Sequence, residues 1–172
     1  MTRLTLALSV AVALAGLSGL AYQAGQPASP GDWRTFTGSW SAVGQRHTLP
    51  TEGGRPSAIV QLSGTVLLTG GEGLSRGFRG EAIGFDDGGS VSVGRVVWTD
   101  ERGDRIFSVL KGEPLETGRR IVGTVTGGTG RYAGLIGEYT LTWQYVLSAE
   151  DAVIQGRAAD LTLRVRRGEV QK

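Results

Sequence analysis

The chain has no cysteine, no asparagine and one histidine among its 172 residues. Without cysteine it has no disulfide framework, no thiol nucleophile and no thiolate metal site. A hydrolytic triad needs a base, and a typical zinc site uses several imidazoles, so the single His47 supports neither. His47 is therefore predicted to be an ordinary surface or strand-end residue, and neither a metal ion nor a cofactor is expected.

The chain also has little net charge. The chain carries 18 Lys and Arg residues against 16 Asp and Glu residues. This balance gives no electrostatic basis for binding nucleic acid, which is not expected as a partner. Four basic residues near the C-terminus are interpreted as a solvated terminus rather than a binding patch. They are Arg164, Arg166, Arg167 and Lys172.

Only one long apolar run occurs, from Leu4 to Ala21, and Arg3 precedes it. This layout predicts a helical secretory signal peptide over residues 1–21, cleaved before Tyr22. An uncleaved anchor is the alternative, since about 18 apolar residues just span a bilayer. The polar, proline-containing linker over residues 22–31 favours cleavage. The protein is thus expected to be exported, periplasmic or secreted, with no stable membrane insertion after cleavage.

Helical periodicity is almost absent from the rest of the chain, where apolar residues recur at every second position. This period of two predicts strands with one buried face. One such face carries Ala58, Val60, Leu62, Gly64, Val66 and Leu68. Near the C-terminus the apolar set is Ala159, Leu161, Leu163 and Val165.

Turn residues separate these runs at regular intervals, as in Asp86-Asp87-Gly88-Gly89. Asp opens a turn through its side-chain acceptor, and glycine supplies positive φ, a role for which this chain has no asparagine. The breaks outline one domain over residues 32–167, followed by a tail at 168–172. Its eight predicted strands cover residues 32–43, 58–68, 76–85, 90–99, 104–111, 119–126, 137–147 and 153–166.

Short strands at even spacing indicate an antiparallel sandwich or barrel. Glycines inside the strands, such as Gly38, Gly64 and Gly80, favour the barrel, because a sheet that bends enough to close needs positions without a Cβ. Closure also removes the exposed edges of a sheet. The predicted fold class is all-β, a closed antiparallel eight-stranded barrel preceded by the signal helix.

The segment "GGTGRYAGLIG", residues 127–137, formally matches the dinucleotide fingerprint G-x-G-x-x-G/A. That fingerprint requires a helix to follow, so that the helix N-terminus faces the pyrophosphate, whereas a strand pattern follows here. No nucleotide is therefore expected. The segment is predicted to be a corner between two strands, with Tyr132 closing the barrel end. The corner residues are Gly127, Gly128, Gly130, Tyr132 and Gly134.

The longer segment "GTVTGGTGRYAGLIGEYTLTW", residues 123–143, resembles the glycine-corner segment of the allene oxide cyclase and dirigent superfamily. The resemblance implies that family's eight-stranded antiparallel barrel, and the motif carries structure rather than catalysis. The stretch "GEGLSRGFRGEAIGFDDG", residues 71–88, resembles small exported bacterial proteins of undetermined role. These resemblances imply a fold and a compartment, not a reaction.

A small barrel either fills its interior with side chains or keeps a pocket for one ligand. Trp40, Phe107, Trp143 and Tyr145 are the candidate ligand-binding residues, although each aromatic alone is more often part of a core. Charged residues within strands provide weak catalytic candidates, namely Arg79, Glu81 and Arg95. If these face inward they need partners and mark a site. The outward alternative, an exposed ion pair of small energetic value, is favoured.

Three hypotheses of function remain open at this level. The first is an exported barrel that binds a small apolar or amphiphilic ligand, or an accessory envelope protein. The second, which the resemblance permits, is a cofactor-independent cyclase or isomerase that moulds a flexible apolar substrate into one reactive conformer. The third is a structural or subunit-contact protein with a packed interior, which would be consistent with a homo-oligomer. A cavity, and the face that Arg79 and Glu81 take, would separate them.

Overall fold

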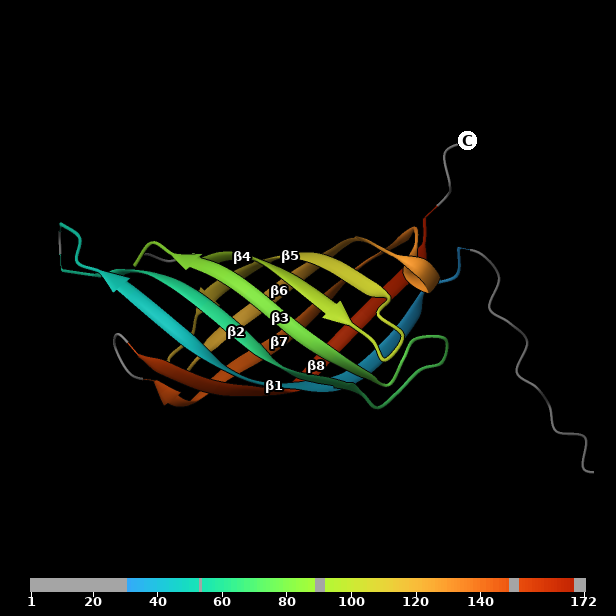
Figure 1. Cartoon of the computed structure of the whole chain (residues 1–172), viewed down its shortest axis with the longest axis horizontal. Coiled ribbons are helices and arrows are strands. Elements are labelled where there is room, and N and C mark those ends of the chain that lie inside the picture. Colours follow the sequence, from blue (N-terminus) through green and yellow to red (C-terminus); the bar gives the residue numbers. More distant parts are fainter. Residues whose placement is uncertain (1–30, 53, 89–91, 149–151, 169–172) are drawn as a thin grey trace, which may run out of the picture.

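A computed structural model describes residues 31–52, 54–88, 92–148 and 152–168. Eight strands follow one another around a closed barrel, and β1 pairs with β8 to complete it (Figure 1). The strands are β1 (Arg34–Leu49), β2 (Ser57–Leu68), β3 (Gly77–Asp86), β4 (Ser92–Thr99), β5 (Arg105–Pro114), β6 (Arg119–Gly128), β7 (Leu135–Ser148) and β8 (Val153–Arg167). All neighbouring pairs are antiparallel. The predicted closed antiparallel eight-stranded barrel is confirmed.

The predicted signal peptide at 1–21, most of the linker and most of the tail lie outside the described residues. Within the ranges that the structure describes, no helix is long and apolar enough to span a membrane. The first described residues and the end of β8 lie at the same end of the barrel (Figure 1).

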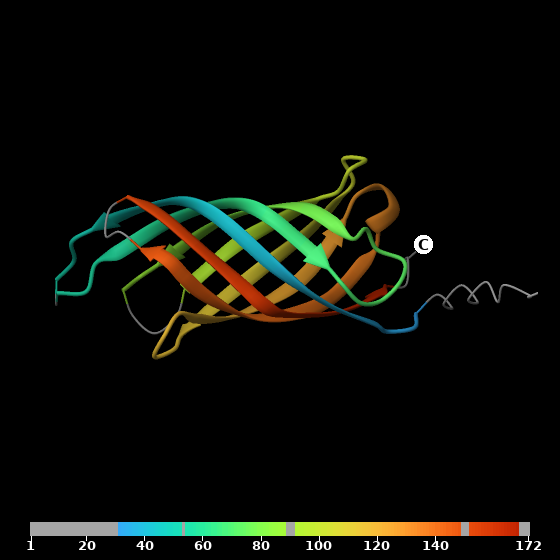
Figure 2. The ribbon, with the colours of Figure 1, turned by 90° about the horizontal axis from the view of Figure 1, so that it is seen from below.

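The first strand is longer than the sequence pattern predicts. β1 continues to Leu49, paired with Ser57 of β2, and it also pairs with β8 as far as Gln45. The hydrophobic alternation stops near Val43, but backbone hydrogen bonds between strands need no apolar side chain. The resulting β1–β2 hairpin projects beyond the other connections at its end of the barrel (Figure 2).

The predicted inward face of β8 is wrong at one position. Ala159 is exposed, whereas Ala158 has only 2% of its surface exposed. The register between β1 and β8 shifts between Gly38 and Trp40, as it does when one strand carries an extra residue. The Asp160 carboxylate accepts a hydrogen bond from the Thr142 backbone N–H of β7 at 2.8 Å. Alternation of apolar residues in the sequence does not reveal such a bulge. The extra residue moves the inward positions of the strand by one and leaves its amino-acid composition unremarkable.

The glycine corner connects β6 and β7 through a 3₁₀ turn, η1 (Gly130–Tyr132). Tyr132 is 1% exposed, and its ring centroid lies 5.8 Å from that of Phe78. Gly130 (φ +51°) and Gly134 (φ +72°) adopt the left-handed conformation that favours glycine. The structure therefore places the segment where a tyrosine closes one end of the barrel.

A hydrogen-bonded carboxylate holds this closed end together. The Asp100 side chain is fully buried and accepts hydrogen bonds from the Arg102 and Asp104 backbone N–H groups at 2.8 and 3.0 Å and from Arg131 Nε at 2.8 Å. Burial alone would raise the pKa of Asp100, but hydrogen bonds from Tyr132, Arg131 and these backbone groups outweigh it and lower the pKa to about 2. Asp100 thus joins the β4–β5 turn to η1.

The two ends of the barrel are filled differently. The closed end is packed with large buried side chains, including Phe36, Phe78, Trp98, Ile106, Tyr132, Tyr139 and Leu163. At the opposite end the inward positions of β3 and β4 carry Ala82, Gly84 and Gly94. Because these residues supply little side-chain volume, the interior is not filled there.

Candidate functional site

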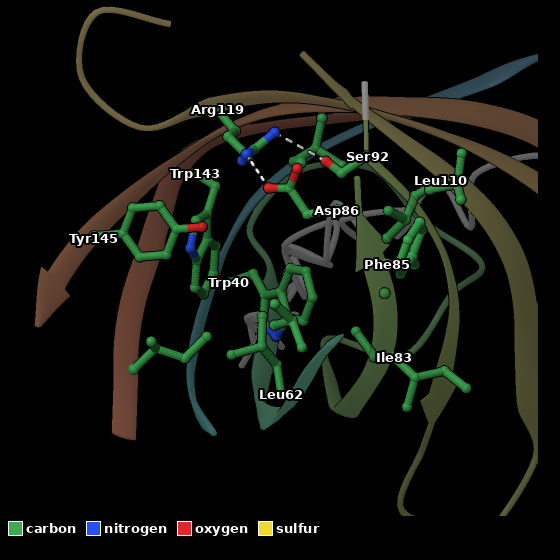
Figure 3. Close-up of a pocket in the computed structure, with 16 residues that line it drawn as sticks. Trp40, Leu62, Ile83, Phe85, Asp86, Ser92, Leu110, Arg119, Trp143 and Tyr145 are labelled. Carbon is green, nitrogen blue, oxygen red and sulfur yellow. Dashed lines mark hydrogen bonds and ion pairs between the residues drawn. The ribbon is translucent and has the colours of Figure 1, made fainter. Parts of the chain in front are cut away.

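A cavity of about 80 Å³ lies inside the end of the barrel opposite η1. Its walls are largely apolar (Figure 3), and every one of the eight strands contributes to them. Among the lining side chains are Trp40, Leu62, Ala82, Leu110, Trp143 and Tyr145. The third hypothesis assumed a completely packed interior, and the interior is not completely packed at this end.

Aromatic rings form one wall of this pocket. The ring centroids of Trp40 and Trp143 are 5.2 Å apart with an interplanar angle of 54°, and Tyr145 meets Trp143 edge-on at 6.4 Å. Gly156 of β8 lies beneath Trp143, and a Cβ there would come within 2.4 Å of the indole ring. The absence of a side chain at Gly156 therefore sets the position of the wall. Such rings offer a rigid apolar surface to a ligand.

A polar cluster interrupts the apolar lining at the edge of the same pocket. Arg119 of β6 forms an ion pair with Asp86 of β3 and donates to Ser92 Oγ at 3.1 Å (Figure 3). The Asp86 carboxylate also accepts the Gly88 backbone N–H at 3.1 Å, and Ser92 Oγ donates to the Gly112 carbonyl at 3.3 Å. The side chains of Arg119 and Asp86 are 19% and 18% exposed, so water screens this pair less than a surface pair.

The structure brings three of the four predicted ligand-binding aromatics together. Trp40, Trp143 and Tyr145 line the pocket, whereas Phe107 does not. Phe107 is half-buried on the outer face of β5, because its neighbours Ile106 and Ser108 point inward with 1% and 3% exposure. The assignment of Phe107 to the pocket is thus corrected by strand alternation.

The predicted catalytic candidates lie outside the barrel. Arg79 NH2 and Glu81 Oε2 are 3.1 Å apart, but their side chains are 65% and 47% exposed. Arg95 of β4 is also exposed. All three alternate with inward residues, so none of them reaches the interior cavity. The exposed ion pair is the outward alternative and contributes little to stability.

The alternation of inward and outward residues in two strands is the sequence signal for the polar cluster. In β3, Asp86 continues the inward positions Ala82 and Gly84, and in β6 Arg119 lies two residues before Ile121 and shares its face. Along the sequence, Asp86 indicates only the start of a turn. The pairing of β3 with β4, β4 with β5 and β5 with β6 then brings Asp86 and Arg119 to the same end.

No group of three or more His, Asp or Glu side chains suited to holding a metal ion occurs within the ranges that the structure describes. The polar side-chain groups at this pocket include one carboxylate, one guanidinium and the hydroxyls of Ser92 and Tyr145. Together they can donate and accept hydrogen bonds at the edge of an apolar cavity.

The fold and site together define a closed eight-stranded antiparallel barrel with an apolar pocket and a shielded ion pair at one end. Among solved structures, the chain is similar to that of the pterocarpan synthase dirigent protein GePTS1, with 12% sequence identity and a TM-score of 0.49. The match covers 82% of this chain and 89% of that one. No protein-family model and no curated protein matches the sequence. The strand pairing of this chain establishes that the barrel is closed, and the side chains of this chain define the pocket.

Proposed function

We propose that this protein is an exported barrel that binds one end of a small, neutral amphiphile. The apolar part of the ligand packs against the wall formed by Trp40 and Trp143, and its polar group meets Asp86 and Arg119. One observation carries the proposal: a shielded, hydrogen-bonded ion pair stands in the wall of an otherwise apolar pocket. Such pockets, with a few placed polar groups, are typical of small-molecule sites.

The ion pair favours a ligand without net charge. A carboxylate ligand would be attracted by Arg119 but repelled by Asp86, and an ammonium ligand would meet the reverse situation. A hydroxyl group can donate to Asp86 and accept from Arg119 at the same time. It can therefore replace its lost water contacts at this wall without leaving a buried charge unpaired.

The size of the cavity limits how much of the ligand is enclosed. Its volume of about 80 Å³ is below the roughly 300–1,000 Å³ of a pocket that encloses a drug-sized molecule. The pocket therefore takes one ring or the end of a short chain, and the remainder of the ligand lies at the barrel end beside the β1–β2 hairpin.

The compartment and the family form part of this proposal. The apolar run at residues 4–21 supports export to the periplasm or beyond, and the segment 123–143 supports membership of the allene oxide cyclase and dirigent superfamily. A carrier or an accessory protein of the cell envelope fits both.

Calorimetric titration of the chain from Tyr22 onward with decanol, decanoic acid and decylamine tests the proposal. The three ligands share one tail and differ only in the head group. We expect decanol to bind at least tenfold more tightly than either charged analogue. Equal or tighter binding of decanoic acid or decylamine would contradict a neutral site. Native mass spectrometry of protein purified from its own host would then identify a retained molecule.

A second candidate function is a cofactor-independent cyclase or isomerase, and the position of Asp86 favours it. A carboxylate at the wall of an apolar pocket can transfer a proton, and Arg119 beside it can stabilise negative charge that develops on a substrate. In that case Asp86→Asn would abolish product formation from a flexible apolar substrate while leaving its binding within about threefold. If the retained molecule is recovered unchanged after prolonged incubation, it is a ligand and not a substrate.

A further inference from the structure

Trp33 lies against two arginines at the closed end of the barrel, far from the pocket. The Arg164 and Arg166 guanidinium carbons lie 4.6 and 5.1 Å from the centroid of its ring. The pairing of Arg34 with Val165 brings the start of β1 beside the end of β8 and creates this cluster. Trp33 is 44% exposed, so the ring is available to a partner.

The two guanidinium groups are not neutralised by a described carboxylate. None of the ion pairs among the described residues involves Arg164 or Arg166. Glu138 of β7 is the cross-strand neighbour of Arg164, but Arg164 turns toward Trp33 instead. The Arg166 Nε atom is buried and has no hydrogen-bond partner in the described part of the chain.

A third arginine extends the positive surface. Arg167 is exposed, and its guanidinium donates to the Arg131 carbonyl oxygen at 2.8 Å on the corner that closes the barrel. Two acidic residues reduce this charge, Asp32 beside Trp33 in the sequence and Glu138 opposite Arg164 on β7. Residues 164–167 thus place three arginines on one strand end.

We propose that this Trp33–arginine cluster docks the closed end of the barrel onto an anionic bilayer surface. Guanidinium groups bind phosphate oxygens in a two-pronged geometry, and each basic residue near an anionic leaflet adds to its attraction. A half-exposed tryptophan beside them suits the boundary between head groups and acyl chains. The proposal is independent of what the pocket binds.

In the sequence, an apolar run precedes this surface. The run from Leu4 to Ala21 precedes Trp33 by a short linker, which can extend at most about 40 Å at roughly 3.5 Å per residue. While that run is in a membrane, the Trp33 end of the barrel stays close to the bilayer. The pocket then opens on the side that faces away from it.

Vesicle co-sedimentation tests the docking surface. The protein is the chain from Tyr22 onward, which keeps all eight strands of the barrel, so the apolar run does not contribute. We expect binding to vesicles of phosphatidylglycerol and phosphatidylcholine at low salt, and none to phosphatidylcholine alone. The double variant Arg164→Gln/Arg166→Gln should lower the partition coefficient about 25-fold, at roughly fivefold per arginine.

A control of the same charge is available on the outer wall of the barrel. Arg79→Gln/Arg95→Gln also removes two exposed arginines, but it should change vesicle binding less than about threefold. Circular dichroism should be the same for all three proteins, because Arg79, Arg95 and Arg164 are exposed and Arg166 is half-buried on the outer face of β8. Equal losses for the two double variants would show that net charge, and not this cluster, governs binding, and would overturn the proposal.

Tryptophan fluorescence gives an independent measurement. Trp40, Trp98 and Trp143 are at most 4% exposed, so acrylamide quenching in solution reports mainly on Trp33. Phosphatidylglycerol vesicles should protect Trp33 from acrylamide, and added salt should reverse the protection because it screens surface charge. Unchanged quenching at saturating vesicles would refute the contact. Binding to duplex DNA with the same arginine dependence, without binding to vesicles, would assign the cluster to nucleic acid instead.

Discussion

Trp40 of β1 and Trp143 of β7 meet across β8, with their ring centroids 5.2 Å apart. The strand between them carries Gly156 and Ala158 at its inward positions, so two large indoles fit above two small residues. This arrangement gives the pocket a firm aromatic wall while leaving space beside it.

Filling the pocket should abolish ligand binding without unfolding the protein. Ala82→Phe places a ring into the cavity, and we expect decanol affinity to fall at least tenfold. Ala159→Phe makes the same change on the exposed bulge of β8 and serves as the control, with affinity expected to stay within twofold. Titration calorimetry measures both. If Ala82→Phe binds decanol like the unaltered protein, the ligand occupies a different place.

The Asp86–Arg119 pair should stabilise the fold more than the Arg79–Glu81 pair. Arg119→Gln leaves a largely shielded carboxylate without its cation and should lower the free energy of unfolding by about 2 kcal/mol. Arg79→Gln should lower it by less than about 0.5 kcal/mol, because its pair is exposed. Urea denaturation compares the two. In addition, Asp86→Asn combined with Arg119→Gln should cost less than the sum of the single changes. Additive costs would mean that the two side chains do not interact in solution.

The packed end should not tolerate a methyl group at Gly123. A Cβ there would lie 2.0 to 2.4 Å from atoms of the Tyr139 ring, which is 1% exposed and cannot move outward. Gly123→Ala should therefore lower the free energy of unfolding by about 3 kcal/mol. At Gly77 the nearest atom to a new Cβ is 4.0 Å away, so Gly77→Ala should change it by less than about 1 kcal/mol. Similar midpoints for both variants in urea would argue against this packing.

The closed end of the barrel, where Asp100 joins the β4–β5 turn to η1, should lose stability in acid. Because the folded-state pKa of Asp100 is lowered to about 2 from an ordinary 3.8, the carboxylate stabilises the fold fully above its unfolded pKa, and this stabilisation is lost as the pH falls from about 4 toward 2. The pKa of Asp160 is lowered as well, because hydrogen bonds from Thr142 outweigh the opposing effect of burial. The Asp160 carboxylate therefore also stabilises the fold less as the pH falls.

Asp100→Asn tests this assignment. The variant should be less stable at pH 7 by about 2 kcal/mol, because Arg131 loses a charged partner, and its stability should depend less on pH between 4 and 2. Thermal unfolding followed across that range measures both effects. Glu116→Gln, at an exposed position of the β5–β6 turn at the other end, is the control. An unchanged acid profile in Asp100→Asn would place the titrating group elsewhere.

The sequence patterns predict the barrel correctly because inward and outward side chains alternate regularly along most of its strands. Inward glycines, alternating apolar residues and the turn at Gly127–Gly137 each act locally, so their effect is visible in short windows. The bulge at Ala159–Asp160 was missed, since an extra residue alters only the register against a partner strand. Phe107 was misplaced for a similar reason: its neighbours Ile106 and Ser108 decide which face it takes.

The pocket cluster was missed because its members belong to different strands. Asp86, Ser92 and Arg119 are ordinary turn or strand-end residues when read along the chain. They meet because three successive antiparallel pairings return the chain to the same end of the barrel. Trp33 and Arg164 meet in the same way, through closure of β1 on β8.

The amino-acid sequence by itself determined where the strands lie, that they close, and which segment turns the corner, because these depend on backbone freedom and on alternation over a few residues. Tertiary structure alone decided which charges reach the interior, which aromatic rings face a cavity and which arginines surround a tryptophan. The reason is geometric: side chains distant in sequence are brought together by strand register, and a shift of one residue turns a strand's side chains to the opposite face.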